Sequence, residues 1–138
     1  MSEAISAALR RAVRERAKHC CEYCLMPDSE MLYPHEPDHI IAVKHRGKTE
    51  SRNLAYACFE RNRAKGSDIS SLDPATNALT SLFNPRQQIW GNHFRFNGPV
   101  IEPRTAEGRV TVLLLNINSP RRVATRYNLI REGKYPIP

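Results

Sequence analysis

The sequence lacks any apolar run long enough to cross a membrane, and its N-terminus has no apolar signal core. Because a membrane helix needs about 20 consecutive apolar residues, we expect no membrane partner and a cytoplasmic protein. Cysteine is also scarce: the chain has only 4, and two of them, Cys20 and Cys21, are adjacent. This usage does not suit the disulfide framework of a secreted protein, so it indicates reduced thiols or a metal site.

Acidic residues are the second shortage. Lys and Arg number 21 against 14 Asp and Glu, which gives a net charge of +7. Seven of these bases lie between Lys44 and Lys65, where there are only two acids. Such a stripe favours a nucleic-acid backbone, reached through phosphate contacts, and an ordinary solvated surface is the alternative. The predicted nucleic-acid-binding residues are Lys44, Arg46, Lys48, Arg52, Arg61 and Arg63.

The composition is otherwise that of a globular protein. With 41% hydrophobic and 25% charged residues, the 138-residue chain fits one compact domain over residues 1–138. Apolar residues at helical spacing from Ile5 predict an N-terminal helix, for which Ser2 is a possible cap. The outer face of that helix would carry three bases, Arg10, Arg14 and Lys18.

The centre of the chain predicts a strand, a basic loop, a second strand and a helix. The strands are expected over residues 38–43 and 54–58, and the helix over 59–66, where glycine ends it. Residues 67–80 are polar with turn signals, and Phe83-Asn84-Pro85 predicts a short helix that ends near Trp90.

The C-terminal third predicts a hairpin and two helices. Asn97-Gly98 is a strong two-residue turn signal between the apolar runs of a hairpin. The run from Val110 to Leu115 suits either a strand or a helix, and Thr105 as a possible cap favours a helix. The last helix runs from Ser119 to Gly133. Its predicted apolar stripe is Val123, Tyr127 and Ile130. The predicted class is therefore α+β, with a ββα core flanked by N- and C-terminal helices and a small second β-hairpin.

The core, from about residue 37 to 66, gathers the residue types that phosphodiester hydrolysis needs. A neutral imidazole at His39 can take a proton from water. Asp38 and the amide oxygen of Asn62 suit Mg²⁺ or Mn²⁺, which prefer oxygen ligands. Asn53 is placed to orient the His39 ring, and Lys65 shares a helix face with Asn62, where it could contact a phosphate.

Three cysteines suggest an incomplete zinc knuckle. Cys21 and Cys24 have the C-x2-C spacing of zinc ligands, and Cys58 begins a second pair. The residue three positions later is Arg61, which cannot bind a metal. Structural zinc is therefore not expected, although His19 or Cys20 could in principle supply a fourth ligand; small buried cysteines at a turn are the preferred interpretation.

The run from Asp38 to Gly66 resembles the HNH endonuclease motif, the ββα-metal finger, and the layout is similar to that of small stand-alone bacterial HNH proteins. The resemblance implies metal-dependent cleavage or nicking of DNA, leaving a 5′-phosphate and a 3′-hydroxyl. In it His39 matches the general base, Asp38 and Asn62 the metal ligands, and Asn53 the central asparagine. The sequence departs from the pattern at Arg61, where the second C-x2-C is lost.

Two further readings of the chain stay open. A catalytically silent nucleic-acid-binding module with an HNH fold would keep the basic stripe without cleavage. A protein-interaction or toxin–antitoxin component is a third possibility. A monomer would nick one strand of double-stranded DNA and a homodimer would cut both, and the sequence does not decide between them. Trp90, His93 and Phe94 are expected to pack a secondary core and are assigned no chemistry.

Overall fold

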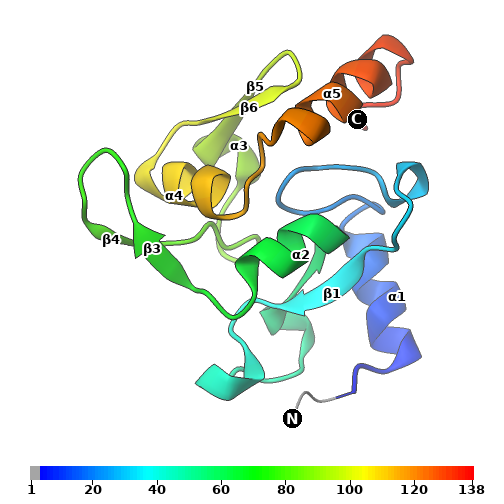
Figure 1. Cartoon of the computed structure of the whole chain (residues 1–138). Helices are drawn as coiled ribbons and strands as arrows, with labels where there is room; N and C mark the ends of the chain where they lie inside the picture. The colour runs from blue at the N-terminus through cyan, green and yellow to red at the C-terminus, as the bar shows by residue number, and fades with distance from the viewer. Residues whose placement is uncertain (1–3) are drawn as a thin grey trace.

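The computed structural model describes residues 4–138, and at its centre a helix lies across a two-stranded antiparallel hairpin (Figure 1). Strand β1 spans Glu36–His39, strand β2 spans Leu54–Ala57, and helix α2, Phe59–Lys65, follows β2 directly. The C-cap of α2 is Gly66, at φ 53°, a region that favours glycine. The predicted ββα core is therefore confirmed.

Strand β1 lies earlier in the chain than the predicted strand over 38–43. Beyond His39 only one more backbone hydrogen bond joins the strands, from Ile40 N to Asn53 O at 2.8 Å. The chain then turns through a 3-10 segment at Val43–His45. The structure thus ends the strand at His39, so the residues after it form a loop that folds back over the strand end.

Pro37 is tolerated inside β1 because of its place in the ladder. It lies opposite Tyr56, whose N–H donates to Glu22 Oε2 at 3.0 Å and whose carbonyl accepts from Glu22 N at 2.8 Å. Tyr56 therefore turns its backbone groups away from β1, and the missing N–H of proline leaves no partner unsatisfied.

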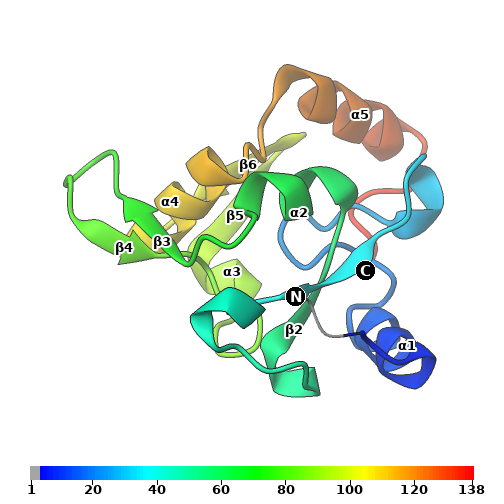
Figure 2. The same ribbon diagram turned by 60° about the horizontal axis from the view of Figure 1, so that its bottom comes forward.

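Helix α1, Ala7–Arg16, packs beneath the hairpin (Figure 2). Its N-cap is Ser6, whose side chain accepts from Leu9 N; Ser2 lies outside the described residues. Two bases of the predicted outer face are paired, because Arg10 contacts Glu36 at 3.0 Å and Arg14 contacts Asp28 at 2.8 Å. These ion pairs join α1 to the start of β1 and to the acidic segment that precedes it.

The remaining elements form two more hairpins and three helices among the described residues (Figure 1). They are β3 (Ser70–Leu72), β4 (Leu79–Ser81), α3 (Trp90–His93), β5 (Phe94–Asn97), β6 (Val100–Pro103), α4 (Ala106–Leu114) and α5 (Pro120–Arg131). The hairpin around Asn97-Gly98 and the helices capped by Thr105 and Ser119 are confirmed. The hairpin β3–β4, which projects away from α1 in both views, was not predicted, and the short helix begins at Trp90 instead of ending there.

Helix α5 buries a different face from the predicted one. Tyr127 is 51% exposed and Ile130 37%, whereas Arg122, Arg126 and Leu129 are buried. The guanidinium of Arg126 is used internally, since its three nitrogens donate to the carbonyls of Pro99 and Ile117 and to the side chain of Asn118. Arginine therefore takes core positions on this helix.

Two apolar clusters hold these elements together. The larger joins the cysteine turn and β2 to the C-terminal half, and includes Tyr23, Ala55, Phe94, Ile101 and Leu115. The smaller packs Val13 of α1 against Leu54 and Tyr56. Phe94 is buried in the larger cluster and Trp90 packs against it, so these residues belong to the main core and not to the predicted secondary one. In the described part of the chain, no helix combines the length and the apolar character of a membrane span.

Candidate active site

Asn53 fixes the loop that connects β1 with β2. Its Oδ1 accepts from Ile41 N at 2.9 Å, and its Nδ2 donates to the carbonyls of Ile41 and Lys48, each at 2.9 Å. The side-chain amide is thus occupied by backbone groups and does not orient the His39 ring as predicted. Asn53 instead holds the backbone of the loop that follows His39, through Ile41 and Lys48.

Gly47 lets this loop close. A Cβ atom built on it would lie 1.7 Å from the carbonyl oxygen of Ile41 and 2.9 Å from Asn53 Nδ2. Its own N–H donates to Ala42 O at 3.0 Å. Only glycine fits at this approach of two backbone segments.

His39 is the last residue of β1, and its ring is held by Thr49 of the loop. Its Nε2 lies 2.8 Å from Thr49 Oγ1, and the residue is partly exposed. One of these two atoms donates and the other accepts, and because a hydroxyl can do either, the contact holds the ring plane without selecting the tautomer. Thr49 therefore has the orienting position that was predicted for Asn53. Sequence spacing offered no signal for it, because Ser51 is an equally placed hydroxyl.

Asp38 and Lys65 form a buried ion pair behind His39. The side chains are 8% and 2% exposed, Lys65 Nζ lies 3.0 Å from Asp38 Oδ2, and it also donates to the His39 carbonyl at 3.0 Å. Burial raises the pKa of Asp38, and the positive charge of Lys65 partly offsets that rise. The predicted contact of Lys65 with a phosphate is not available from this position, since the ammonium lies inside the protein.

An open cavity of about 560 Å³ brings three of the predicted residues together. Asp38 and His39 reach it from the end of β1, and Asn62 reaches it from α2. Successive side chains of a regular strand point to opposite faces, but β1 ends here and both residues line the same cavity. The lining is Pro37, Asp38, His39, Ala42, Val43, Lys44, Asn62, Gly66 and Ser67.

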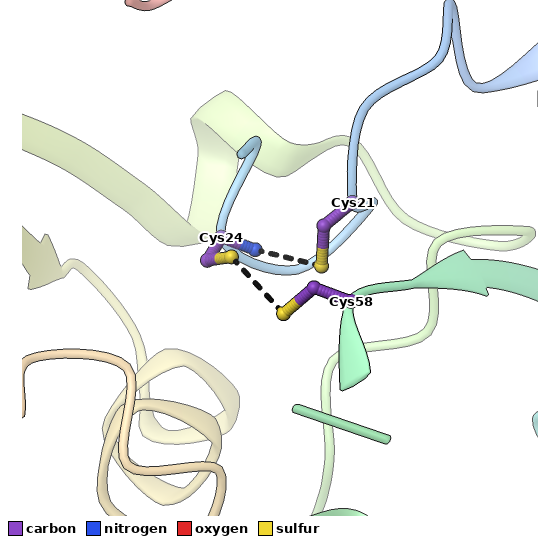
Figure 3. A group of neighbouring side chains, drawn as sticks. All are labelled: Cys21, Cys24 and Cys58. Carbon is purple, nitrogen blue, oxygen red and sulfur yellow. Dashed lines mark hydrogen bonds between the residues drawn. The ribbon is translucent and has the colours of Figure 1, made fainter. Parts of the chain in front are cut away.

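A group of three buried thiols lies between the cysteine turn and the start of α2, and its sulfur atoms face one another (Figure 3). All three sulfurs of Cys21, Cys24 and Cys58 lie within 4.8 Å of one another, and Cys24 Sγ is 3.8 Å from Cys58 Sγ. Backbone N–H groups of Tyr23 and Cys24 donate to Cys21 Sγ. Hydrogen bonds with Cys21 and Cys58 lower the pKa of Cys24. These thiols could hold a metal ion.

Arg61 requires a correction. It was predicted to contact nucleic acid, but it is buried at 2% exposure, with Nη2 donating to Glu60 Oε2 at 3.3 Å. Its positive charge also lowers the pKa of Cys24. A side chain inside the protein cannot bind a phosphate backbone, so Arg61 is not one of the nucleic-acid-binding residues.

The remaining bases of the stripe lie on the surface. Lys44, Arg46 and Lys48 are exposed on the loop that Asn53 holds. Arg63 is exposed on α2, its guanidinium 5.3 Å from the centre of the Phe59 ring. Arg52 is exposed but paired with Glu50 at 2.8 Å. Lys44 also lines the cavity, so the basic loop and the candidate site adjoin each other.

Comparison with known protein families finds a match, and it covers the part of the chain that contains both the cavity and the thiols. Residues 21–68 match the model of the HNH endonuclease family. The predicted resemblance is thereby confirmed over the HNH segment, which includes the cysteine turn, the β1–β2 hairpin and all of α2. HNH domains are nuclease domains that bind a divalent metal, and nucleic acids are their substrates. No curated protein and no solved structure matches the chain significantly.

Proposed function

We propose that the protein is a metal-dependent HNH endonuclease that hydrolyses DNA phosphodiester bonds, with residues 1–138 acting as one nuclease domain in the cytoplasm. The observation that carries the proposal is the meeting of Asp38, His39 and Asn62 at one open cavity within the segment that matches the family. An imidazole, a carboxylate and an amide are the groups that activated hydrolysis of a phosphate ester needs.

The donor set fits a hard divalent cation. Asp38 and Asn62 would hold Mg²⁺ or Mn²⁺ through oxygen atoms, since both residues line the open cavity. The ion would supply positive charge to the scissile phosphate and the leaving oxygen. Lys65 would keep the carboxylate ionised at neutral pH against the effect of burial.

The chain's own residues would then perform the proton transfer and the positioning. His39 takes a proton from the attacking water. The accepting atom is Nδ1 if Nε2–H donates to Thr49, and Nε2 if the Thr49 hydroxyl donates to it. The Asn53-held loop keeps Thr49 in place and presents Lys44, Arg46 and Lys48 to the phosphate backbone. Water attack in line with the leaving 3′-oxygen yields a 5′-phosphate and a 3′-hydroxyl.

The first experiment compares the parent with His39→Ala on supercoiled plasmid, with Mg²⁺, Mn²⁺ or EDTA. We expect metal-dependent conversion to open-circular or linear DNA and a loss of at least roughly a hundredfold in His39→Ala. His45→Ala is the matched control, because His45 is an exposed histidine of the same loop with no contact to His39. Equal cleavage by the parent and His39→Ala would refute the assigned base.

One observation favours a silent nucleic-acid-binding module instead. Asp38 already has a positively charged partner in Lys65, so its carboxylate is balanced without a metal ion. This alternative predicts that folded protein retards plasmid on a gel, with steep loss of binding as salt rises, and never converts it. Nicking that EDTA abolishes would refute it, and the DNA form produced separates one-strand from two-strand cutting.

A further inference from the structure

The thiol group lacks the fourth ligand of a structural zinc site. Such sites close tetrahedrally around four donors, usually two C-x2-C pairs. Here Cys21, Cys24 and Cys58 supply three, and the residue three positions after Cys58 is Arg61. A guanidinium has N–H donors and no lone pair for a metal. The sequence position that would supply the fourth ligand therefore holds a permanent cation.

Neither alternative ligand closes the site. Cys20 Sγ lies 3.5 Å from the carbonyl of Lys18 and is not part of the group, and His19 is exposed. The three grouped cysteines are only 0–1% exposed, so bulk water does not reach them as a ready fourth ligand. Among the described residues the donor set thus stops at three thiols, which does not fit a closed zinc site.

Arg61 is an unusual residue to bury at this point. It is 2% exposed, and its Nε and Nη1 have no hydrogen-bond partner. Leaving N–H donors of a buried cation unpaired is costly unless negative charge or polarisable atoms lie close by. Arg61 lies one helical turn after Cys58, the N-cap of α2, so the three thiols are gathered at the same end of this helix.

Two more buried arginines sharpen the charge imbalance. Arg122 and Arg126 of α5 are 3% and 0% exposed. Within residues 4–138, Glu60 is the one carboxylate that pairs with any of the three arginines: it contacts both Arg61 and Arg122. Arg126 donates only to neutral oxygens. The interior beside the thiols therefore carries more positive charge than its carboxylates balance.

We propose that Arg61 takes the place of the structural metal in this knuckle. Its guanidinium provides, from the chain itself, the positive charge that a zinc ion would provide between the cysteine turn and α2. The thiol group and Arg61 together hold the turn against the N-terminus of α2, which carries Asn62. The fold then forms and persists without zinc, independently of whether the candidate active site binds Mg²⁺.

The test begins with the metal content and thermal stability of the unmodified protein. We expect zinc far below a full equivalent per chain after purification from zinc-supplemented medium, and a Tm that a zinc-selective chelator does not change. A full equivalent of zinc, whose removal lowers the Tm, would overturn the proposal. This measurement needs no variant and no nuclease activity, so its result tests the Arg61 proposal independently of the proposed nuclease function.

The second arm restores a fourth thiol with Arg61→Cys. We expect this variant to bind one zinc per chain, to gain roughly 5 °C or more in Tm on adding zinc, and to give a thiolate-to-metal charge-transfer band with Co²⁺. Arg61→Ser is the matched control, because it removes the guanidinium without adding a ligand, and it should gain none of these. If folded Arg61→Cys bound no zinc, the thiols would not be a knuckle and the proposal would fail. If Arg61→Cys did not fold, the metal content of the unmodified protein would decide alone.

Discussion

Removing the positive charge of Lys65 should destabilise the protein far more than removing a surface charge. Lys65 and Asp38 have side chains 2% and 8% exposed, and their charged atoms lie 3.0 Å apart. Lys65→Met keeps the apolar stem and leaves the Asp38 carboxylate buried without its partner. Breaking such a pair costs about 3–5 kcal/mol, which corresponds to a fall in Tm of roughly 10–15 °C for a chain of this size.

The chain offers a matched control in Arg10→Met. Arg10 and Glu36 form an ion pair at the same 3.0 Å separation, but their side chains are 48% and 44% exposed. Loss of an exposed pair costs about 0–1 kcal/mol. Denaturant unfolding of both variants and the parent, followed by circular dichroism, gives the two free energies directly. If Lys65→Met lost no more stability than Arg10→Met, the Lys65–Asp38 pair would not behave as a buried charge pair, and this reasoning would be refuted.

The same variant carries a pH signature with a definite sign. Burial raises the pKa of Asp38 above its ordinary 3.8, and Lys65 opposes that rise, so the variant's Asp38 pKa should be higher still. A carboxyl with a raised folded-state pKa contributes stability that is present below its unfolded pKa and lost as pH rises through the folded one. The deficit of Lys65→Met should therefore be full at neutral pH and shrink on acidification. A deficit independent of pH would assign it to lost packing.

Two smaller predictions concern the loop over the candidate site. Gly47→Ala should cost at least roughly 1–3 kcal/mol in unfolding free energy, because its Cβ would overlap the Ile41 carbonyl, whereas Gly91→Ala, with no atom within 4 Å of the added Cβ, should change little. Thr49→Val should lower kcat of plasmid cleavage about tenfold with little change in Tm, because it removes the hydroxyl that holds the His39 ring in place, and Thr49→Ser should restore it. Unchanged kcat in Thr49→Val would mean that the contact does not orient the base.

The elements predicted correctly from sequence are those with local signals. Ser119 followed by proline, Thr105 as a cap, and Asn97-Gly98 between apolar runs each specify an end or a turn by their own chemistry. Strand β1 was misplaced because its residues, Glu36 to His39, are neither alternating nor β-branched. Its pairing depends on Tyr56 turning towards Glu22, a contact between segments far apart in sequence.

The positions of the site residues were predictable, but their contacts were not. Spacing along a strand and a helix was enough to expect Asp38, His39 and Asn62 at one place, and the cavity contains all three. The partner of His39 was assigned to Asn53, yet loop closure places Thr49 there and turns the Asn53 amide onto Ile41. A loop's path decides such contacts, and the sequence gives no periodicity from which to derive it.

Buried cations changed the interpretation of the charge more than any other feature. Sequence reasoning assigns Lys and Arg to the surface, where they usually lie. In this chain Arg61 and Lys65 of α2 are internal, and each pairs with a carboxylate, that of Glu60 or of Asp38. The basic stripe is thereby reduced to the loop residues Lys44, Arg46, Lys48 and Arg52 with Arg63. Of the two internal cations, Lys65 balances the carboxylate that would hold Mg²⁺, and Arg61 stands at the sequence position of the fourth knuckle ligand. Both stand on the helix that presents Asn62, so the same short helix links the fold's charge balance to the candidate chemistry.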